Sequence, residues 1–173
     1  MNTSKELDEL TVAAEAGKVD AQVKLAFAYT KGVQVGQDFV QAAKWYELAA
    51  TAGDAIAQHN LACMFLNGQG VHKDGSQAVH WFEQAALQGD VDSQFNLGLL
   101  FDKGELVEGD EAKASHWFLQ AAENGSARAQ YEMGVRCLSG RGVEKSLEKA
   151  RQWLQQAADQ GVARAHHQLL NLS

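Results

Sequence analysis

Proline is absent from the 173-residue chain, cysteine occurs only twice, and acidic residues outnumber basic ones. Without proline nothing interrupts a helix interior, so the composition suits a mostly helical protein. The formal net charge of −7 argues against a nucleic-acid-binding surface, which is usually basic. No run of about 18 apolar residues occurs, so no membrane-spanning helix is expected. The N-terminal stretch MNTSKELDEL lacks an apolar core, so no signal peptide is expected and a native Met1 predicts a cytoplasmic protein.

The sequence repeats itself with a fixed period of 36 residues. HWFEQAALQG at 80–89 returns almost unchanged as HWFLQAAENG at 116–125. Several residue types keep the same step along the whole chain: Trp45, Trp81, Trp117 and Trp153; Gly17, Gly53, Gly89, Gly125 and Gly161; Gly32, Gly68, Gly104 and Gly140. A constant period of this size is typical of repeat arrays.

Each period predicts a helical hairpin. In the period 54–89, Asp54 is expected to cap a first helix and Gly68 to end it. A short loop follows, and Asp74 with Gln77 resembles the capping box of a second helix. Asp90 and Ser126 repeat the role of Asp54, whereas Lys18 and Val162 cannot, so those two helices should begin less firmly.

The apolar positions of the second helix predict its buried face. Ala78, Trp81, Phe82, Ala85 and Ala86 recur at helical spacing. The small side chains would let two helices approach closely, and the tryptophan is expected to fill the wider gap beside them.

The sequence therefore predicts an all-α fold, an α/α superhelical solenoid of helical hairpins. We expect one domain over 1–173, with a capping helix at 4–16, four repeats and a closing helix at 163–172. The expected repeats are 18–53, 54–89, 90–125 and 126–161. Single helices at both ends are typical caps of a stack.

The repeated pattern resembles that of the Sel-one-like repeat family, relatives of the tetratricopeptide repeats. NLACMFLNGQGVHKDGSQAVHWFEQAALQG at 60–89 carries the pattern nearly in full, and the resemblance covers essentially the whole chain. The second loop glycine is kept at Gly70 and Gly142 but replaced by Gln34 and Leu106, which leaves the loop geometry of repeats one and three open. The resemblance implies an adaptor that holds protein partners.

By the same resemblance, the first helix of each hairpin should line the concave surface. Its variable positions fall at i, i+3, i+7 and i+10 and are largely apolar, which is typical of an interaction site. We predict a protein or peptide site centred on Phe95, Leu99 and Tyr131, with Arg128 as a further anchor. The other predicted contacts are His59, Leu66, Asp92, Asp102 and Leu138.

Charge is uneven along the array and could orient such a partner. Residues 90–125 contain eight acidic and two basic residues, and 126–161 contain four acidic and six basic ones. Charge of this kind acts mainly on association rate and specificity.

Two alternative functions remain open at this stage. Ser146 and Lys149 have the S-x-x-K spacing of penicillin-recognising enzymes, and some cysteine-rich relatives have been linked to β-lactam binding. The companion motifs S-D-N and K-T-G are absent from the sequence, and a serine at this position can simply cap a helix. A self-associating structural module, using terminal residues such as Leu169, Leu170 and Leu172, is the other alternative.

The histidines and cysteines predict no further chemistry. His80 and His116 lack carboxylate or cysteine neighbours at ligand spacing, and the acidic run 102–111 lacks the pattern of an EF-hand. Neither a metal nor a cofactor is expected. Cys63 and Cys137 lie about two repeats apart. A disulfide requires the Cα atoms of its two cysteines to lie within about 7 Å, so both cysteines are expected to be free thiols.

Overall fold

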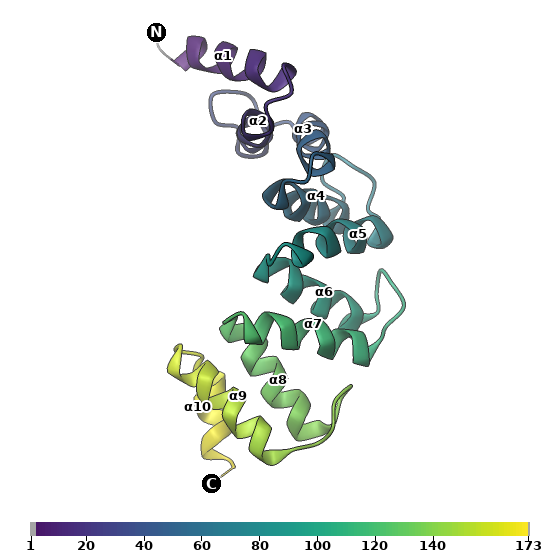
Figure 1. The fold of residues 1–173 in the computed structure, drawn as a ribbon, viewed down its shortest axis with the longest axis vertical. Helices are drawn as coiled ribbons and strands as arrows, with labels where there is room; N and C mark the ends of the chain where they lie inside the picture. Colours follow the sequence, from purple (N-terminus) through teal and green to yellow (C-terminus); the bar gives the residue numbers. More distant parts are fainter. Residues whose placement is uncertain (1–2, 173) are drawn as a thin grey trace. The chain divides into compact units, whose positions relative to one another are not determined.

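In the computed structural model, which describes residues 3–172, the regular structure is helical throughout (Figure 1). The helices along the chain are α1 (Thr3–Glu15), α2 (Val19–Lys31), α3 (Phe39–Thr51), α4 (Ala55–Asn67), α5 (Gly75–Leu87), α6 (Val91–Lys103), α7 (Glu111–Glu123), α8 (Ala127–Ser139), α9 (Leu147–Asp159) and α10 (Ala163–Leu170). Helices α2 to α9 form four hairpins of the expected period, which confirms the predicted all-α solenoid. The last helix ends at Leu170 and is followed by a turn, although the sequence pattern predicts a helix to 172.

The helices are divided between two compact units, with the boundary between Gln88 and Gly89. The N-terminal unit contains α1 to α5 and the C-terminal unit contains α6 to α10. Within each unit every helix packs against the next one along the chain. The first helix of each hairpin is called helix A below, and the second is called helix B; α1 is of the B type and α10 of the A type.

The helix starts follow the predicted caps. Asp54 Oδ1 accepts a hydrogen bond from the Ala57 N–H at 2.8 Å, and Asp90 and Ser126 make the equivalent bonds. Lys18 and Val162 make no side-chain cap, as expected. Each capping acceptor satisfies an N–H group that has no partner in the first helical turn.

The loops between helices A and B depend on left-handed backbone. Gly68, which ends α4, has φ 70°, and Gly70 in the same loop also has φ 70°. A Cβ atom at Gly70 would lie 2.0 Å from the Phe39 carbonyl oxygen, so no other residue fits there. Gln34 keeps the left-handed conformation with φ 66°, whereas Leu106 does not. The loop of repeat one therefore keeps the left-handed conformation of the glycine-containing loops at this position, and the loop of repeat three does not.

The deepest side chain of helix B is the residue after the tryptophan. Tyr46, Phe82, Phe118 and Leu154 occupy this position and are at most 2% exposed. Trp81, Trp117 and Trp153 are half-buried, and only Trp45 is buried. The tryptophan is therefore only partly buried in three of the four repeats, although Trp81 packs against the N-terminal core, and the residue after it is the large side chain that points fully inward.

A small residue of helix A makes room for this deep side chain. In the C-terminal unit the small residues are Gly98 and Gly134, both buried. A Cβ atom at Gly98 would lie 2.6 Å from Cδ1 and Cε1 of Phe118, and one at Gly134 would lie 2.6 Å from Cγ of Leu154. The Phe118 ring and the Leu154 side chain occupy the space that a Cβ atom would need, so they would have to shift if alanine replaced either glycine.

We expect Gly98→Ala to destabilise the chain, although alanine is the better helix former. Overpacking a core costs about 1–3 kcal/mol, whereas the gain in helix propensity is about 1 kcal/mol, so the net loss should be about 1 kcal/mol. Urea unfolding followed by circular dichroism measures this loss. Gly36→Ala is the control because a Cβ atom there meets nothing within 4 Å. Equal stability of Gly98→Ala and the wild type would contradict the tight helix packing.

A second recurring contact joins successive hairpins through glutamine. Gln58 is buried, and its Nε2 donates to the Ala50 carbonyl at 3.1 Å. Gln88, just past the end of α5, donates through Nε2 to Gln58 Oε1 at 2.8 Å. Gln130 and Gln160 repeat the arrangement in the C-terminal unit, with a distance of 2.7 Å. These bonds satisfy polar groups that would otherwise be buried without partners.

Candidate functional site

The accessible face of helix A matches the predicted stripe at some positions and differs from it at others. In α2 the exposed residues are Asp20, Lys24, Phe27 and Lys31, at i, i+4, i+7 and i+11. The prediction placed Val23 and its equivalents on this face, but Val23 is half-buried and packs against the N-terminal core. Lys24 is exposed, and its equivalents Asn60, Asn96, Glu132 and Gln168 are half-buried, so this position adds partly accessible polar side chains to the candidate face.

Phe95 is a core residue, so its predicted role as an accessible anchor is wrong. Its side chain is 6% exposed, and its ring lies 5.5 Å from that of Phe118, centroid to centroid, with 56° between the planes. The Arg128 guanidinium covers the outer side of the Phe95 ring at 4.4 Å from the centroid. The ring points toward α7 because its position faces the partner helix of the hairpin.

Arg128 and Asp92 lie at the surface and pair with each other. Arg128 Nη2 lies 3.1 Å from Asp92 Oδ1, and both side chains are mainly exposed. An exposed pair of this kind contributes only about 0–1 kcal/mol. Both side chains border an open depression of about 400 Å³ that Asn124 and Ser126 also line, so they remain accessible to a partner.

The remaining predicted contact residues are half-buried. Tyr131 and Leu138 pack against the C-terminal cluster formed by Leu154, Ala157 and Ala165. In the N-terminal unit, the His59 ring meets the Phe82 ring edge-on at 5.6 Å, and its Nε2 lies 3.6 Å from Cys63 Sγ. Leu66 and Leu99 also keep part of their surface exposed.

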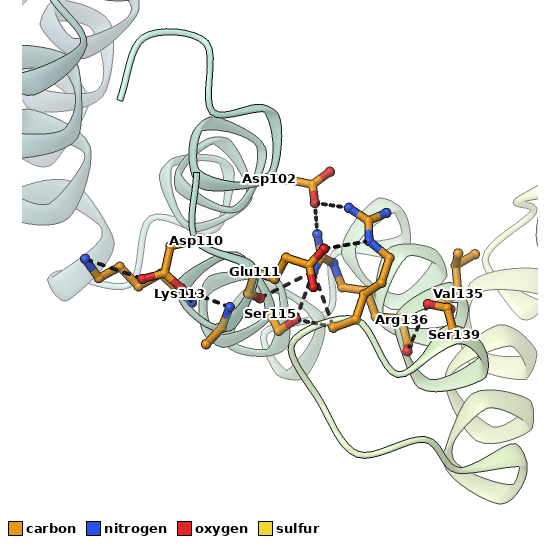
Figure 2. Close-up of polar contacts among 10 residues, drawn as sticks. Asp102, Asp110, Glu111, Lys113, Ser115, Val135, Arg136 and Ser139 are labelled. Carbon is orange, nitrogen blue, oxygen red and sulfur yellow. Dashed lines mark hydrogen bonds and ion pairs between the residues drawn. The ribbon is translucent and has the colours of Figure 1, made fainter. Parts of the chain in front are cut away.

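A polar cluster at the junction of repeats three and four was not predicted as a unit. The cluster consists of Asp102, Glu111, Ser115, Arg136 and Arg141, and is called the Arg136 cluster below. Arg136 is 1% exposed. Its Nη2 donates to Asp102 Oδ1 and its Nη1 donates to Ser115 Oγ at 2.9 Å. Figure 2 shows Arg136 between the side chains of Asp102 and Ser115.

Arg141 closes the outer side of this cluster. Its Nη2 donates to Asp102 Oδ1 at 2.6 Å, and its Nε lies 3.6 Å from Glu111 Oε1. The Arg141 carbonyl accepts a hydrogen bond from Ser115 Oγ at 2.9 Å. The Arg136 guanidinium also stacks on the Phe118 ring at 4.9 Å from the centroid. Asp102 is therefore a structural partner of two arginines, in addition to being one of the partner contacts that the sequence predicts.

The signal for the Arg136 cluster was present in the sequence. The residues at the position of Arg136 in the other repeats are Ala28, Met64 and Leu100, and all of them are buried. The position of Asp102 contains Thr30, Leu66 and Leu138 elsewhere. A charge of each sign replacing an apolar pattern residue in adjacent repeats predicts a buried ion pair, because an isolated buried charge is costly.

Ser146 caps helix α9 and shows no catalytic environment. Its Oγ accepts a hydrogen bond from the Lys149 N–H at 3.3 Å, as in the other capped helices. The Lys149 side chain is exposed. This geometry is that of a helix cap and adds nothing to the β-lactam alternative.

The other sequence expectations concern metals, thiols and membranes. Across residues 3–172, no group of three His, Cys, Asp or Glu side chains is arranged to hold a metal ion. In the same part of the chain neither Cys63 nor Cys137 forms a disulfide, and burial raises the pKa of the Cys137 thiol. None of the described helices is both long and apolar enough to cross a bilayer.

The fold and the helix A faces define an α/α repeat protein. The family model of the Sel1 (Sel-one-like) repeat matches residues 19–54, 55–90, 91–126 and 127–162. The chain therefore belongs to the Sel1 repeat family, as the resemblance implied.

Solved structures agree with this assignment. A protective antigen of uropathogenic Escherichia coli with an SLR fold is 37% identical, with a TM-score of 0.89 over 94% of this chain and 35% of that one. A Sel1 repeat protein of Oxalobacter formigenes is 35% identical, with a TM-score of 0.85 over 96% of this chain and 48% of that one. The chain thus spans about a third to a half of these relatives. Helicobacter pylori cysteine rich protein B, 18% identical over 76% of this chain and 94% of that one, shares the fold with a TM-score of 0.59. No curated protein matches the sequence.

Proposed function

We propose that the chain is a non-catalytic adaptor that binds a peptide or protein segment on its helix A face. Members of the Sel1 family are generally protein-interaction scaffolds, and the family assignment is the observation that carries this proposal. The accessible positions of helix A support it, because they differ from repeat to repeat while the packing positions recur. Phe27 and Ile56, for example, are 53% and 62% exposed.

The C-terminal unit offers a defined part of this face. Leu99 on α6 and Val135 on α8 occupy equivalent positions and are both half-buried. Asp92 and Lys103 on α6 and Arg128 on α8 are exposed on the same two helices. An apolar strip within a charged rim is the usual arrangement of an interaction surface.

The proposal predicts that Leu99→Asp weakens the binding of peptides that were selected on the wild-type chain from a displayed random library. Affinity should fall by at least tenfold, or about 1.4 kcal/mol, because the carboxylate meets the apolar part of the peptide. Fluorescence anisotropy with a labelled selected peptide measures the loss.

Leu147→Asp is the matched control, since Leu147 is an exposed leucine on the B-type helix α9. A thermal melt establishes that both variants are folded. Equal weakening by the two substitutions would place binding elsewhere on the chain, and the absence of any enriched peptide would refute the adaptor function in this form.

A further inference from the structure

Glu132 on α8 indicates which kind of peptide the chain would bind, because its carboxylate is partly accessible. Glu132 is half-buried and occupies the position of Lys24, Asn60, Asn96 and Gln168 in the other repeats and the closing helix. Among residues 3–172 it forms neither a hydrogen bond nor an ion pair. It is therefore a negative charge in a position that is otherwise an amide or, at Lys24, a lysine, and no hydrogen bond or ion pair to it is formed within the described residues.

The arginines near Glu132 form their direct ion pairs with other carboxylates. Arg136 and Arg141 lie near it, but both donate to Asp102, and Arg141 also pairs with Glu111. Arg164 on α10 is exposed, and its positive charge also acts on Glu132. Burial raises the pKa of the Glu132 carboxyl, and the attraction of Arg136, Arg141 and Arg164 offsets only part of that effect, while Asp102 adds to it.

The free-energy cost of an unpaired charge is larger for half-buried Glu132 than for exposed basic residues, so this face favours a positively charged ligand. Exposed Arg164 and Lys103 are hydrated and gain little from a partner. A half-buried carboxylate has lost part of its hydration, so an incoming cation that pairs with it recovers more free energy. The aliphatic part of a lysine or arginine side chain can at the same time cover apolar surface.

We propose that Glu132 binds the cationic group of a lysine or arginine side chain of a peptide, and that Leu99 and Val135 contact an apolar residue next to it. Val135 lies three residues after Glu132, on the same side of α8. Leu99 is the equivalent residue of α6. This inference rests on the proposed function and specifies the partner as a basic and apolar segment.

The first test is a peptide-display selection on the 173-residue chain, on Glu132→Gln and on Glu148→Gln. Glu148 is an exposed carboxylate on α9 and is the matched control. Peptides enriched on the wild type and on the control are expected to contain Lys or Arg next to an apolar residue. The best of these peptides should bind Glu132→Gln about tenfold more weakly, as measured by fluorescence anisotropy.

A change in the peptide separates pairing from any effect on folding. Replacing its basic residue with glutamine should weaken binding to the wild type about tenfold and cause no further loss with Glu132→Gln. Acidification should also weaken wild-type binding as the pH falls through the raised pKa of Glu132, because only the ionised carboxylate attracts the cation. This dependence should be absent in Glu132→Gln.

The outcomes distinguish the two proposals. Selected peptides without a basic residue, or equal affinity of a basic peptide for the wild type and Glu132→Gln, would overturn the role of Glu132 while leaving the adaptor function intact. If no peptide is enriched on any of the three proteins, the adaptor function fails and this inference fails with it.

Discussion

Asp102→Asn is expected to lower the free energy of unfolding by about 2–3 kcal/mol. The substitution removes the carboxylate that accepts from both Arg136 and Arg141, while Arg136 remains 1% exposed. Loss of one partner of a buried pair typically costs about 3–5 kcal/mol. The expected value is lower because the Asp102 side chain is 23% exposed and Arg136 keeps its hydrogen bond to Ser115. Urea unfolding monitored by circular dichroism measures the loss.

Replacing both charges should restore the stability. Asp102→Leu combined with Arg136→Leu introduces the residues that occupy these positions in other repeats, for example Leu66 and Leu100. Exchange of a buried ion pair for apolar residues of similar volume is often neutral or stabilising. We therefore expect the double variant to unfold at or above the urea concentration of the wild type. Glu111→Gln is the control, because the Glu111 side chain is 61% exposed and should change stability by less than about 0.5 kcal/mol.

Two results would contradict this account of the Arg136 cluster. A loss of less than about 0.5 kcal/mol for Asp102→Asn would show that water or a neighbouring group compensates Arg136. A double variant less stable than Asp102→Asn would show that the cluster stabilises the junction beyond neutralising its own charges.

Local chemistry could be predicted from the sequence because it depends on neighbours along the chain. Asp54 caps its helix and Gly68 ends it in left-handed backbone, as the spacing of their residue types indicates. The 36-residue period then transfers such a prediction from one hairpin to the next. For the same reason the all-α solenoid and the Sel1 family could be identified before any structural comparison.

The rotation of each helix about its axis could not be predicted with the same accuracy. Consecutive residues of an α-helix point about 100° apart, and an apolar position of a repeat can belong to the core or to the accessible face. The apolar series that contains Phe95 is buried at Phe95 and half-buried at Val23 and Tyr131. Only the packing of α6 against α7, with Phe118 opposite, places the Phe95 ring inside.

The candidate site depends on contacts between residues distant in sequence. Asp102 and Arg136 are separated by 34 residues and pair only because successive hairpins stack. The predicted stripe follows positions i, i+3, i+7 and i+10, so it includes Tyr131 and omits Glu132, which is the next residue. A comparison of equivalent positions across repeats would have marked both Arg136 and Glu132 as departures from the pattern.

Phe118→Ala should destabilise the chain more than Trp117→Ala, although tryptophan is the repeated residue. Phe118 is 0% exposed, contacts the Phe95 ring and lies under the Arg136 guanidinium. Its removal leaves a cavity in the core and should cost about 3–5 kcal/mol. Trp117 is half-buried, and the His116 ring meets it edge-on at 5.2 Å. Its loss should cost about 1–3 kcal/mol because part of its surface is already hydrated.

Phe27→Ala is the matched control for the size and chemistry of the substitution. Phe27 is 53% exposed on α2, so removing its ring should change the free energy of unfolding by less than about 1 kcal/mol. Urea unfolding of the three variants, monitored by circular dichroism, gives the order directly. A larger loss for Trp117→Ala than for Phe118→Ala would mean that helix α7 turns its tryptophan inward. In that case the assignment of buried and accessible positions would have to be shifted by one residue along the B-type helices.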